Sequence, residues 1–358
     1  MKPTIFYDIH KAAGAKLVDF AGFAMPVQYS SIINEHKAVR TAVGVFDVSH
    51  MGEVFVRGEK AAEFVQKITV NDVTKLFPGR VQYSAMCYHD GGIVDDLLVY
   101  KISDTEFFLV INASNIEKDV AWMHENNTFG VQIENKSESF SLLAVQGSSS
   151  RVTLEKAFGI TLDMEYYYFS TFEILGKQMI VSRTGYTGEL GYELYFEGDA
   201  TFGAELWNTL FAAGAEYGIT ACGLGSRDSL RLEKGFCLYG NEIDATTNPL
   251  EAGLGWITKL GKGEFNGSAV LKEIKAAGLK RKLVAITTEG KIIPRHGYPV
   301  KVNGEEVGVV ASGTMSPMLE KGIATAYVKV EFATEGTEIF VDVRGREVAA
   351  TVVKFPFV

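Results

Sequence analysis

The segment Gly91-Gly-Ile-Val-Asp-Asp-Leu-Leu-Val-Tyr100 places two carboxylates, Asp95 and Asp96, inside an otherwise apolar strand. Successive side chains on a strand point to opposite faces, so the two acids face different surroundings. An ionised carboxylate in an apolar environment is costly unless it is paired or hydrogen-bonded, or unless the protein uses its charge. The pattern therefore leaves two explanations open, an ion pair with a nearby arginine and a functional acid.

A glycine-rich segment, Arg183-Thr-Gly-Tyr-Thr-Gly-Glu-Leu-Gly-Tyr-Glu193, could also carry chemistry. Glycines at this density let the backbone approach a ligand closely or form a tight turn. The segment lacks the lysine of a phosphate-binding loop and does not follow a Rossmann strand in register, which argues against a phosphate site. A plain turn between two strands is the alternative.

Charged residues are concentrated in Gly223-Leu-Gly-Ser-Arg-Asp-Ser-Leu-Arg-Leu-Glu233. Arg227 and Arg231 are four residues apart and share one face of a predicted helix. They could form a fork that binds a carboxylate, because guanidinium holds carboxylates bidentately. Asp228 and Glu233 could instead neutralise them in a structural network.

His50 lies in Phe46-Asp-Val-Ser-His-Met-Gly52, at the join of two predicted segments. A lone histidine in such a place is more often a hydrogen-bonded structural residue than a base. We therefore expect a structural role for it.

Composition limits the classes of protein that fit. The 358 residues are 47% apolar and 22% charged, and the net charge of −9 is spread without long runs of one sign, which favours neither nucleic acid nor a membrane surface as the main partner. Three dispersed cysteines suggest neither a disulfide framework nor a metal site. The N-terminus lacks the apolar core of a signal peptide, and no stretch approaches the roughly eighteen apolar residues of a spanning helix. We predict a cytoplasmic protein.

Helical and strand patterns interleave along the chain. The spacing predicts helices near 31–40 with Ser31 as N-cap, 60–68, 115–126, 201–215, 224–233 and 268–277, the last ended by Gly278. It predicts strands at 54–56, 81–88, 93–101, 107–112, 140–146, 178–182 and 192–196. No regular alternation of strand, helix and parallel strand is present, so an α+β fold is expected rather than a doubly wound sheet.

The pattern changes after about residue 260. From Lys282 to the end, apolar and polar residues alternate, interrupted by the turn dipeptides Asn303-Gly304 and Arg344-Gly345. This predicts a small C-terminal domain made of strands, folded as a barrel.

Several of these segments, in this order, resemble one family closely. They are Asp47-Val-Ser-His-Met-Gly, Tyr83-Ser, Gly91-Gly-Ile-Val-Asp-Asp-Leu, Val110-Ile-Asn-Ala-Ser-Asn, Arg183-Thr-Gly-Tyr-Thr-Gly-Glu, the arginine motif 223–233 and Ser312-Gly-Thr-Met-Ser-Pro. Together they are similar to the aminomethyltransferases (T-proteins) of the glycine cleavage system. The resemblance extends from Val18-Asp-Phe-Ala-Gly to the C-terminus.

The resemblance implies an α+β architecture of three domains arranged as a cloverleaf around a central folate cavity. Two domains are mixed α/β-sheet domains and the third is β-barrel-like. By similarity the first comprises residues 1–50 plus 139–270, the second is inserted at 51–138, and the barrel covers 280–358.

The activity implied is transfer of the aminomethyl carbon from the lipoyl arm of H-protein to tetrahydrofolate. The products are 5,10-methylenetetrahydrofolate, ammonia and dihydrolipoyl H-protein, and no metal is required. The resemblance makes Asp96 the catalytic residue. It assigns folate binding to Glu193, Tyr186, Arg227, Tyr83, Asn112 and Met51.

Two related functions share this fold. One is a tetrahydrofolate-dependent demethylase of a sulfonium or N-methyl substrate. The other is an iron–sulfur assembly factor that binds folate without clear transferase activity and carries Lys-Gly-Cys-Tyr. The corresponding stretch here is Lys234-Gly-Phe-Cys-Leu-Tyr, with the cysteine one place later, and this is closer to the T-protein pattern.

Overall fold

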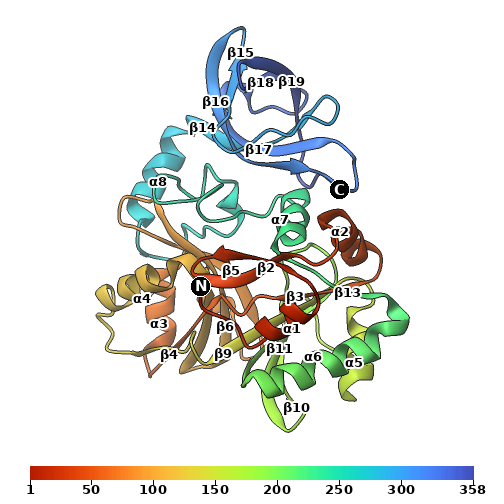
Figure 1. Cartoon of the computed structure of the whole chain (residues 1–358). Helices are drawn as coiled ribbons and strands as arrows, with labels where there is room; N and C mark the ends of the chain where they lie inside the picture. Colours follow the sequence, from red (N-terminus) through yellow and green to blue (C-terminus); the bar gives the residue numbers. More distant parts are fainter. The chain divides into compact units, whose positions relative to one another are not determined.

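A computed structural model describes residues 1–358, and its chain divides into two compact units. The first unit contains residues 1–61, 76–82 and 98–230, and the second contains 62–75, 83–97 and 231–358. The chain therefore passes between the units five times. Figure 1 shows the order of the elements along the chain.

A six-stranded sheet forms the centre of the first unit. Its order is β10-β11-β12-β9-β3-β13. The strands are β3 (Val43–Asp47), β9 (Phe140–Gln146), β10 (Phe169–Ile174), β11 (Lys177–Ser182), β12 (Gly191–Glu197) and β13 (Ile219–Ala221). Only β13 pairs in parallel, with β3, so the expected absence of a doubly wound sheet is confirmed.

Each face of this sheet has its own apolar core. On one side, Leu143 and Val145 of β9 pack with residues of α5 (Ser150–Phe158) and α6 (Ala200–Gly214), including Leu154 and Leu206. On the other side, an aromatic cluster contains Phe55, Tyr100, Phe108 and Tyr195. The alternation of the strands separates these two sets of side chains.

The five-stranded sheet has the order β5-β6-β7-β4-β8. Its strands are β4 (Gly52–Arg57), β5 (Val81–Cys87), β6 (Ile93–Ser103), β7 (Glu106–Ile111) and β8 (Gln132–Asn135). The remaining elements before residue 280 are α1 (Tyr7–Ala12), β1 (Lys16–Phe20), β2 (Phe23–Gln28), α2 (Ile32–Thr41), α3 (Ala61–Ile68), α4 (Ile116–Glu125), α7 (Leu224–Glu233) and α8 (Ser268–Ala277). Ser31 caps α2, because its side chain accepts a hydrogen bond from the Asn34 amide, as predicted.

The C-terminal strands close into a barrel in the order β14-β17-β16-β15-β18-β19. They are β14 (Arg281–Thr288), β15 (Pro299–Val302), β16 (Glu305–Met315), β17 (Gly322–Lys329), β18 (Glu338–Val343) and β19 (Arg346–Val353), drawn in blue in Figure 1. Both predicted turn dipeptides join neighbouring strands with positive φ at each residue. The predicted fold class, mixed α/β sheets followed by a β-barrel, is confirmed.

Some elements were not predicted from the sequence: α1, β1, β2, β3, β8, β10, β13 and α5. β3 is buried throughout, so it lacks the alternation that marks a half-exposed strand. β13 has only three residues. None of the helices combines the length and the apolar character that a membrane-spanning helix needs.

Candidate functional site

Asp96 and Tyr83 form one group of candidate residues, and both belong to the second unit. The Tyr83 hydroxyl on β5 donates to Oδ2 of Asp96 on β6 at 2.9 Å. Both residues are half-buried, whereas the neighbouring Asp95 is 0% exposed. The predicted difference between the faces of the two acids is thus visible as a difference in burial.

Trp256 lies beside this pair and was missed by sequence reasoning. Its ring centroid is 6.1 Å from that of Tyr83, and the two planes are inclined by 30°. The indole is 64% exposed at the end of a short 3₁₀ helix, Leu254–Trp256. The available signal was an aromatic residue in the glycine-flanked segment Gly253-Leu-Gly-Trp, where no apolar periodicity requires burial.

Glu193 belongs to a hydrogen-bonded group in the first unit. Its Oε2 accepts hydrogen bonds from the Thr184 hydroxyl at 2.5 Å and from the Tyr195 hydroxyl at 3.2 Å. The Tyr195 hydroxyl is also 2.9 Å from that of Tyr100. Although only 6% exposed, the carboxylate is therefore well provided with donors.

Arg227 on α7 adds a positive charge to this group. Its guanidinium lies over the Tyr186 ring, 4.7 Å from the centroid, at a cation–π distance. Burial lowers the pKa of Arg227, while the charges of Glu193 and the nearby tyrosines act in the opposite direction. Glu193, Tyr186 and Arg227 thus combine an anion, an aromatic ring and a cation within one unit.

The glycines of the 183–193 segment serve a packing role. A Cβ on Gly185 would lie 2.0 Å from Oε1 of Gln146, and one on Gly191 would lie 2.3 Å from its Cδ. Gln146 donates to the carbonyls of Thr184 and Tyr192 and accepts from Thr187. The close approach allowed by these two glycines is therefore to Gln146, which holds the loop between β11 and β12.

Met51 and Asn112 are half-buried and belong to the first unit. Met51 packs against the aromatic cluster. Asn112 follows the last residue of β7 directly. Among the seven candidates, the structure thus groups Tyr83 with Asp96 and, separately, Tyr186 with Glu193 and Arg227.

Arg231 has a structural role in the second unit. Its guanidinium forms a buried salt bridge with Glu242 at 2.8 Å, an acid that the sequence did not indicate. Arg231 also donates to Ser312. Glu233 accepts from the Ser316 hydroxyl and the Met318 amide. The i, i+4 spacing therefore does not make a two-arginine fork.

The hydrogen bonding of His50 also differs from what the sequence predicted. The residue is 3% exposed, and its Nδ1 lacks the hydrogen bond that was expected of a structural histidine. Burial lowers the pKa of His50 to about 4, and the charge of Arg227 acts in the same direction. The imidazole is neutral near pH 7.

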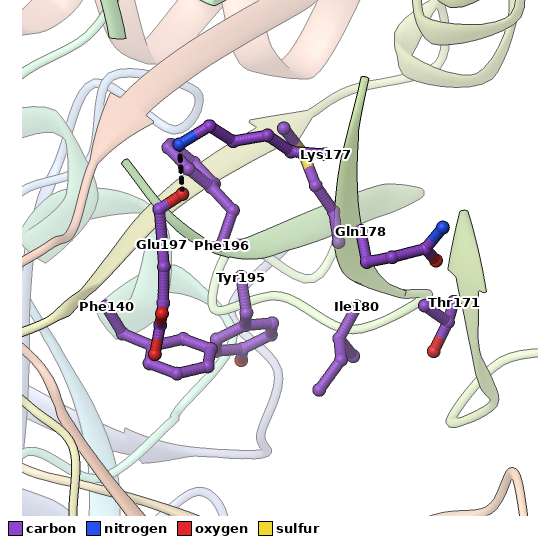
Figure 2. A pocket seen from close by; sticks show the side chains of 9 residues that line it. Phe140, Thr171, Lys177, Gln178, Ile180, Tyr195, Phe196 and Glu197 are labelled. Carbon is purple, nitrogen blue, oxygen red and sulfur yellow. Dashed lines mark hydrogen bonds between the residues drawn. The ribbon is translucent and has the colours of Figure 1, made fainter. Parts of the chain in front are cut away.

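An open groove of about 410 Å³ lies on the six-stranded sheet and is lined by residues of β9, β10, β11 and β12 (Figure 2). The Lys177 ammonium donates to the Glu197 carbonyl there at 3.1 Å. None of the seven predicted site residues lines it. Tyr195, which donates to Glu193, is its only link to the group described above.

Comparisons with known proteins cover almost the whole chain. Residues 6–262 match the family model described as the GCVT N-terminal domain, and residues 281–358 match the glycine cleavage T-protein C-terminal barrel domain. The chain belongs to the glycine cleavage T-protein family.

Known aminomethyltransferases are similar to this chain over almost their full length. An aminomethyltransferase of Halothermothrix orenii is 51% identical, with 100% of both chains covered, and one of Bacteroides fragilis is 52% identical over 100% of this chain and 99% of its own. The crystal structure of glycine cleavage system aminomethyltransferase T from Bartonella henselae has a TM-score of 0.92 at 33% identity and covers 100% of this chain and 98% of its own.

The family identifies the activity. The protein is an aminomethyltransferase of the glycine cleavage system, and tetrahydrofolate is its substrate. The resemblance stated from the motifs is confirmed.

Proposed function

We propose that Asp96 is the catalytic residue in transfer of the aminomethyl carbon from the lipoyl arm of an H-protein to tetrahydrofolate. In this transfer the carbon–nitrogen bond to ammonia and the carbon–sulfur bond to the lipoyl group break. Two new carbon–nitrogen bonds to folate form, giving 5,10-methylenetetrahydrofolate. The two N–H protons that folate loses balance those gained by ammonia and the thiol.

Positive charge develops on the transferred carbon when its first leaving group departs. A carboxylate fixed next to that carbon stabilises the charge and can accept a proton from the attacking folate nitrogen. Tyr83 supports this role, because its hydroxyl holds one Asp96 oxygen at 2.9 Å. A hydrogen bond of this kind fixes the direction of the carboxylate before substrate arrives.

The pterin of tetrahydrofolate is assigned to Glu193, Tyr186 and Arg227. A carboxylate such as Glu193 can accept two hydrogen bonds from the pterin amino group and ring N–H. Thr184 and Tyr195 both donate to Oε2, which restricts the orientation of the carboxylate. Tyr83, Asn112 and Met51 are proposed as further folate contacts, and exposed Trp256 offers an aromatic face beside Tyr83.

The observation that carries the proposal is the contrast between adjacent acids. Asp96 is half-buried and held by Tyr83, whereas Asp95 is fully buried on the other face of β6. Of the two acids, only Asp96 retains exposed surface. Membership of a transferase family then makes this acid the candidate for catalysis.

Reconstitution tests the function directly. The purified protein is mixed with tetrahydrofolate and a lipoylated H-protein carrying the aminomethyl group. Ammonia and 5,10-methylenetetrahydrofolate are expected in equal amounts, and neither is expected with unlipoylated H-protein. Demethylation of a sulfonium or N-methyl donor in place of this reaction would assign the protein to the rival enzyme.

The reaction suggests a partner, and the cysteines suggest a location. The aminomethyl group is carried by a lipoylated protein, so we propose H-protein as the partner. All three cysteines are buried free thiols, in keeping with a reducing cytoplasm.

A further inference from the structure

Tyr83, the residue that holds Asp96, lies on a strand at the edge of its sheet. Strand β5 ends the order β5-β6-β7-β4-β8, so β6 is its only neighbour in the sheet. The segment 69–71 also pairs with β5, and the Val70 amide donates to the Ala85 carbonyl at 2.9 Å. An edge strand depends on such additional contacts for its position, so the residues that continue the pairing toward Tyr83 matter for the site.

Asn71 continues this pairing with its side chain. Its Nδ2 donates to the Tyr83 carbonyl at 2.9 Å, and its main-chain amide donates to Oγ of Ser84 at 3.1 Å. Its Oδ1 accepts a hydrogen bond from the Asp72 amide at 2.8 Å, so only one orientation of the side-chain amide satisfies both partners. Asn71 is 8% exposed. The backbone of β5 is thereby fixed at Tyr83.

Lys262 fixes the main chain of Asn71 in turn. Its Nζ donates to the carbonyls of Gln66, Thr69 and Asn71 at 2.7, 2.5 and 2.7 Å. An ammonium group has three N–H donors, and three main-chain carbonyls accept from it here. The Nζ also lies 4.9 Å from the centroid of the Phe265 ring. The segment after α3 is therefore tied to the chain around residue 262.

The hydrogen bonds of Asn71 bear on the direction of the Asp96 carboxylate. Asn71, Lys262, Tyr83 and Asp96 all belong to the second unit. The Tyr83 hydroxyl lies at the far end of its side chain, so a small rotation of the backbone displaces the hydroxyl further than it displaces Cα. A hydrogen bond weakens steeply when its distance and angle depart from the preferred values.

We propose that Asn71 is a positioning residue for aminomethyl transfer. By holding β5 at Tyr83 it places the Tyr83 hydroxyl on Asp96, and Lys262 keeps the main chain of Asn71 in place. This inference rests on the proposed role of Asp96 as the catalytic residue. It gives a function to the segment 69–71, which the mechanism above leaves unused.

A double-substitution experiment separates this role from a merely structural one. Asn71→Ala removes the donor to the Tyr83 carbonyl, and it is made both in the unaltered protein and in the Tyr83→Phe background, which lacks the hydroxyl. The single-turnover rate is measured with saturating aminomethylated H-protein and tetrahydrofolate, alongside the melting temperature. Asn127→Ala is the matched control, because Nδ2 of Asn127 also donates to a main-chain carbonyl, that of Val131 at 2.7 Å, in the other unit.

We expect Asn71→Ala to lower the rate about fivefold in the unaltered protein and less than about twofold in the Tyr83→Phe background, where the hydroxyl that it positions is absent. Asn127→Ala should lower the melting temperature and leave the rate unchanged. The same fold decrease with and without the hydroxyl would overturn the proposal. An unaltered rate in Asn71→Ala would do the same.

Lys262→Met provides the same comparison if Asn71→Ala does not fold. It keeps an unbranched side chain and removes the donors to the three carbonyls. We expect a rate lower by about threefold, with most of that effect lost in the Tyr83→Phe background, and an equal effect in both backgrounds would contradict the proposal.

The outcomes can be told apart from a failure of the proposed function. A normal rate in Asp96→Asn would refute the proposed function. A lowered rate in Asp96→Asn, together with equal effects of Asn71→Ala in the two Tyr83 backgrounds, would refute this inference alone.

Discussion

Asp95 and Asp96 are adjacent carboxylates whose surroundings differ because a strand alternates its faces. Asp95 is fully buried, and Asp96 is half-buried and bonded to Tyr83. The alternation was predictable from the sequence. The choice between the two acids needed the family resemblance, since alternation alone does not say which face meets the substrate.

Removing the Tyr83 hydroxyl tests whether it orients Asp96. In Tyr83→Phe the carboxylate loses a donor at 2.9 Å, so we expect kcat to fall about tenfold, in line with the loss of one charge-assisted hydrogen bond. Tetrahydrofolate affinity should change less than kcat. Tyr166→Phe, at an exposed tyrosine of the other unit, is the control, and an unaltered kcat in Tyr83→Phe would show that Asp96 is oriented without it.

Glu53 on β4 is a buried acid at 0% exposure whose two carboxyl oxygens have no partner. Burial raises its pKa well above the usual range. The folded state therefore holds this proton more tightly than the unfolded state. Its contribution to stability is fully present below the unfolded pKa of about 4.5 and is lost as pH rises above that value.

Glu53→Gln removes this titration while keeping the side-chain shape. We expect the variant to be more stable than the unaltered protein at pH 7 by roughly 1 to 3 kcal/mol, and the advantage to shrink toward pH 4.5. Denaturant unfolding at several pH values measures this. Glu197→Gln, at an exposed acid, should show no such trend, and a Glu53→Gln advantage that did not vary with pH would contradict the argument.

At the scale of elements, the loop between β11 and β12 connects buried Gln146 to residues that we propose as folate contacts. It carries Thr184, which holds Glu193, and Tyr186, which lies under Arg227. The loop is fixed by the three hydrogen bonds of buried Gln146. A change in this packing should therefore disturb both stability and folate binding.

Gly185→Ala introduces a Cβ at 2.0 Å from Oε1 of Gln146, so the glutamine must move and give up hydrogen bonds. We expect a loss of roughly 2 to 4 kcal/mol in the free energy of unfolding and a several-fold weaker affinity for tetrahydrofolate. Gly261→Ala meets no atom within 4 Å and is the control. Equal stability of the two variants would show that Gln146 does not hold this loop.

In helix α7, residue spacing predicted the helix but not the partners of its arginines. The sequence correctly predicted the helix and the shared face of Arg227 and Arg231. It could not predict that Arg231 pairs with Glu242, because Glu242 follows in a segment without regular secondary structure and the pairing depends on tertiary packing. The buried salt bridge of Arg231 therefore does not follow from its spacing to Arg227.

At the scale of the whole molecule, the barrel and most long elements were predictable because their periodicity and turn residues are local signals. β3 and β13 were not, since one is uniformly buried and the other is very short. The exposed Trp256 and the unpartnered His50 and Glu53 were also beyond prediction, because exposure and hydrogen bonding are properties of the folded chain. Ordered motifs over nearly the full length identified the family where individual motifs could not.

The central claim is that Asp96 stabilises the transition state of aminomethyl transfer. Its most direct test is the single-turnover rate of 5,10-methylenetetrahydrofolate formation by Asp96→Asn with saturating aminomethylated H-protein and tetrahydrofolate. The expected result is a rate lower by roughly a hundredfold or more, about 3 kcal/mol of lost stabilisation, with tetrahydrofolate affinity nearly intact. A normal single-turnover rate in the asparagine variant would contradict the assignment.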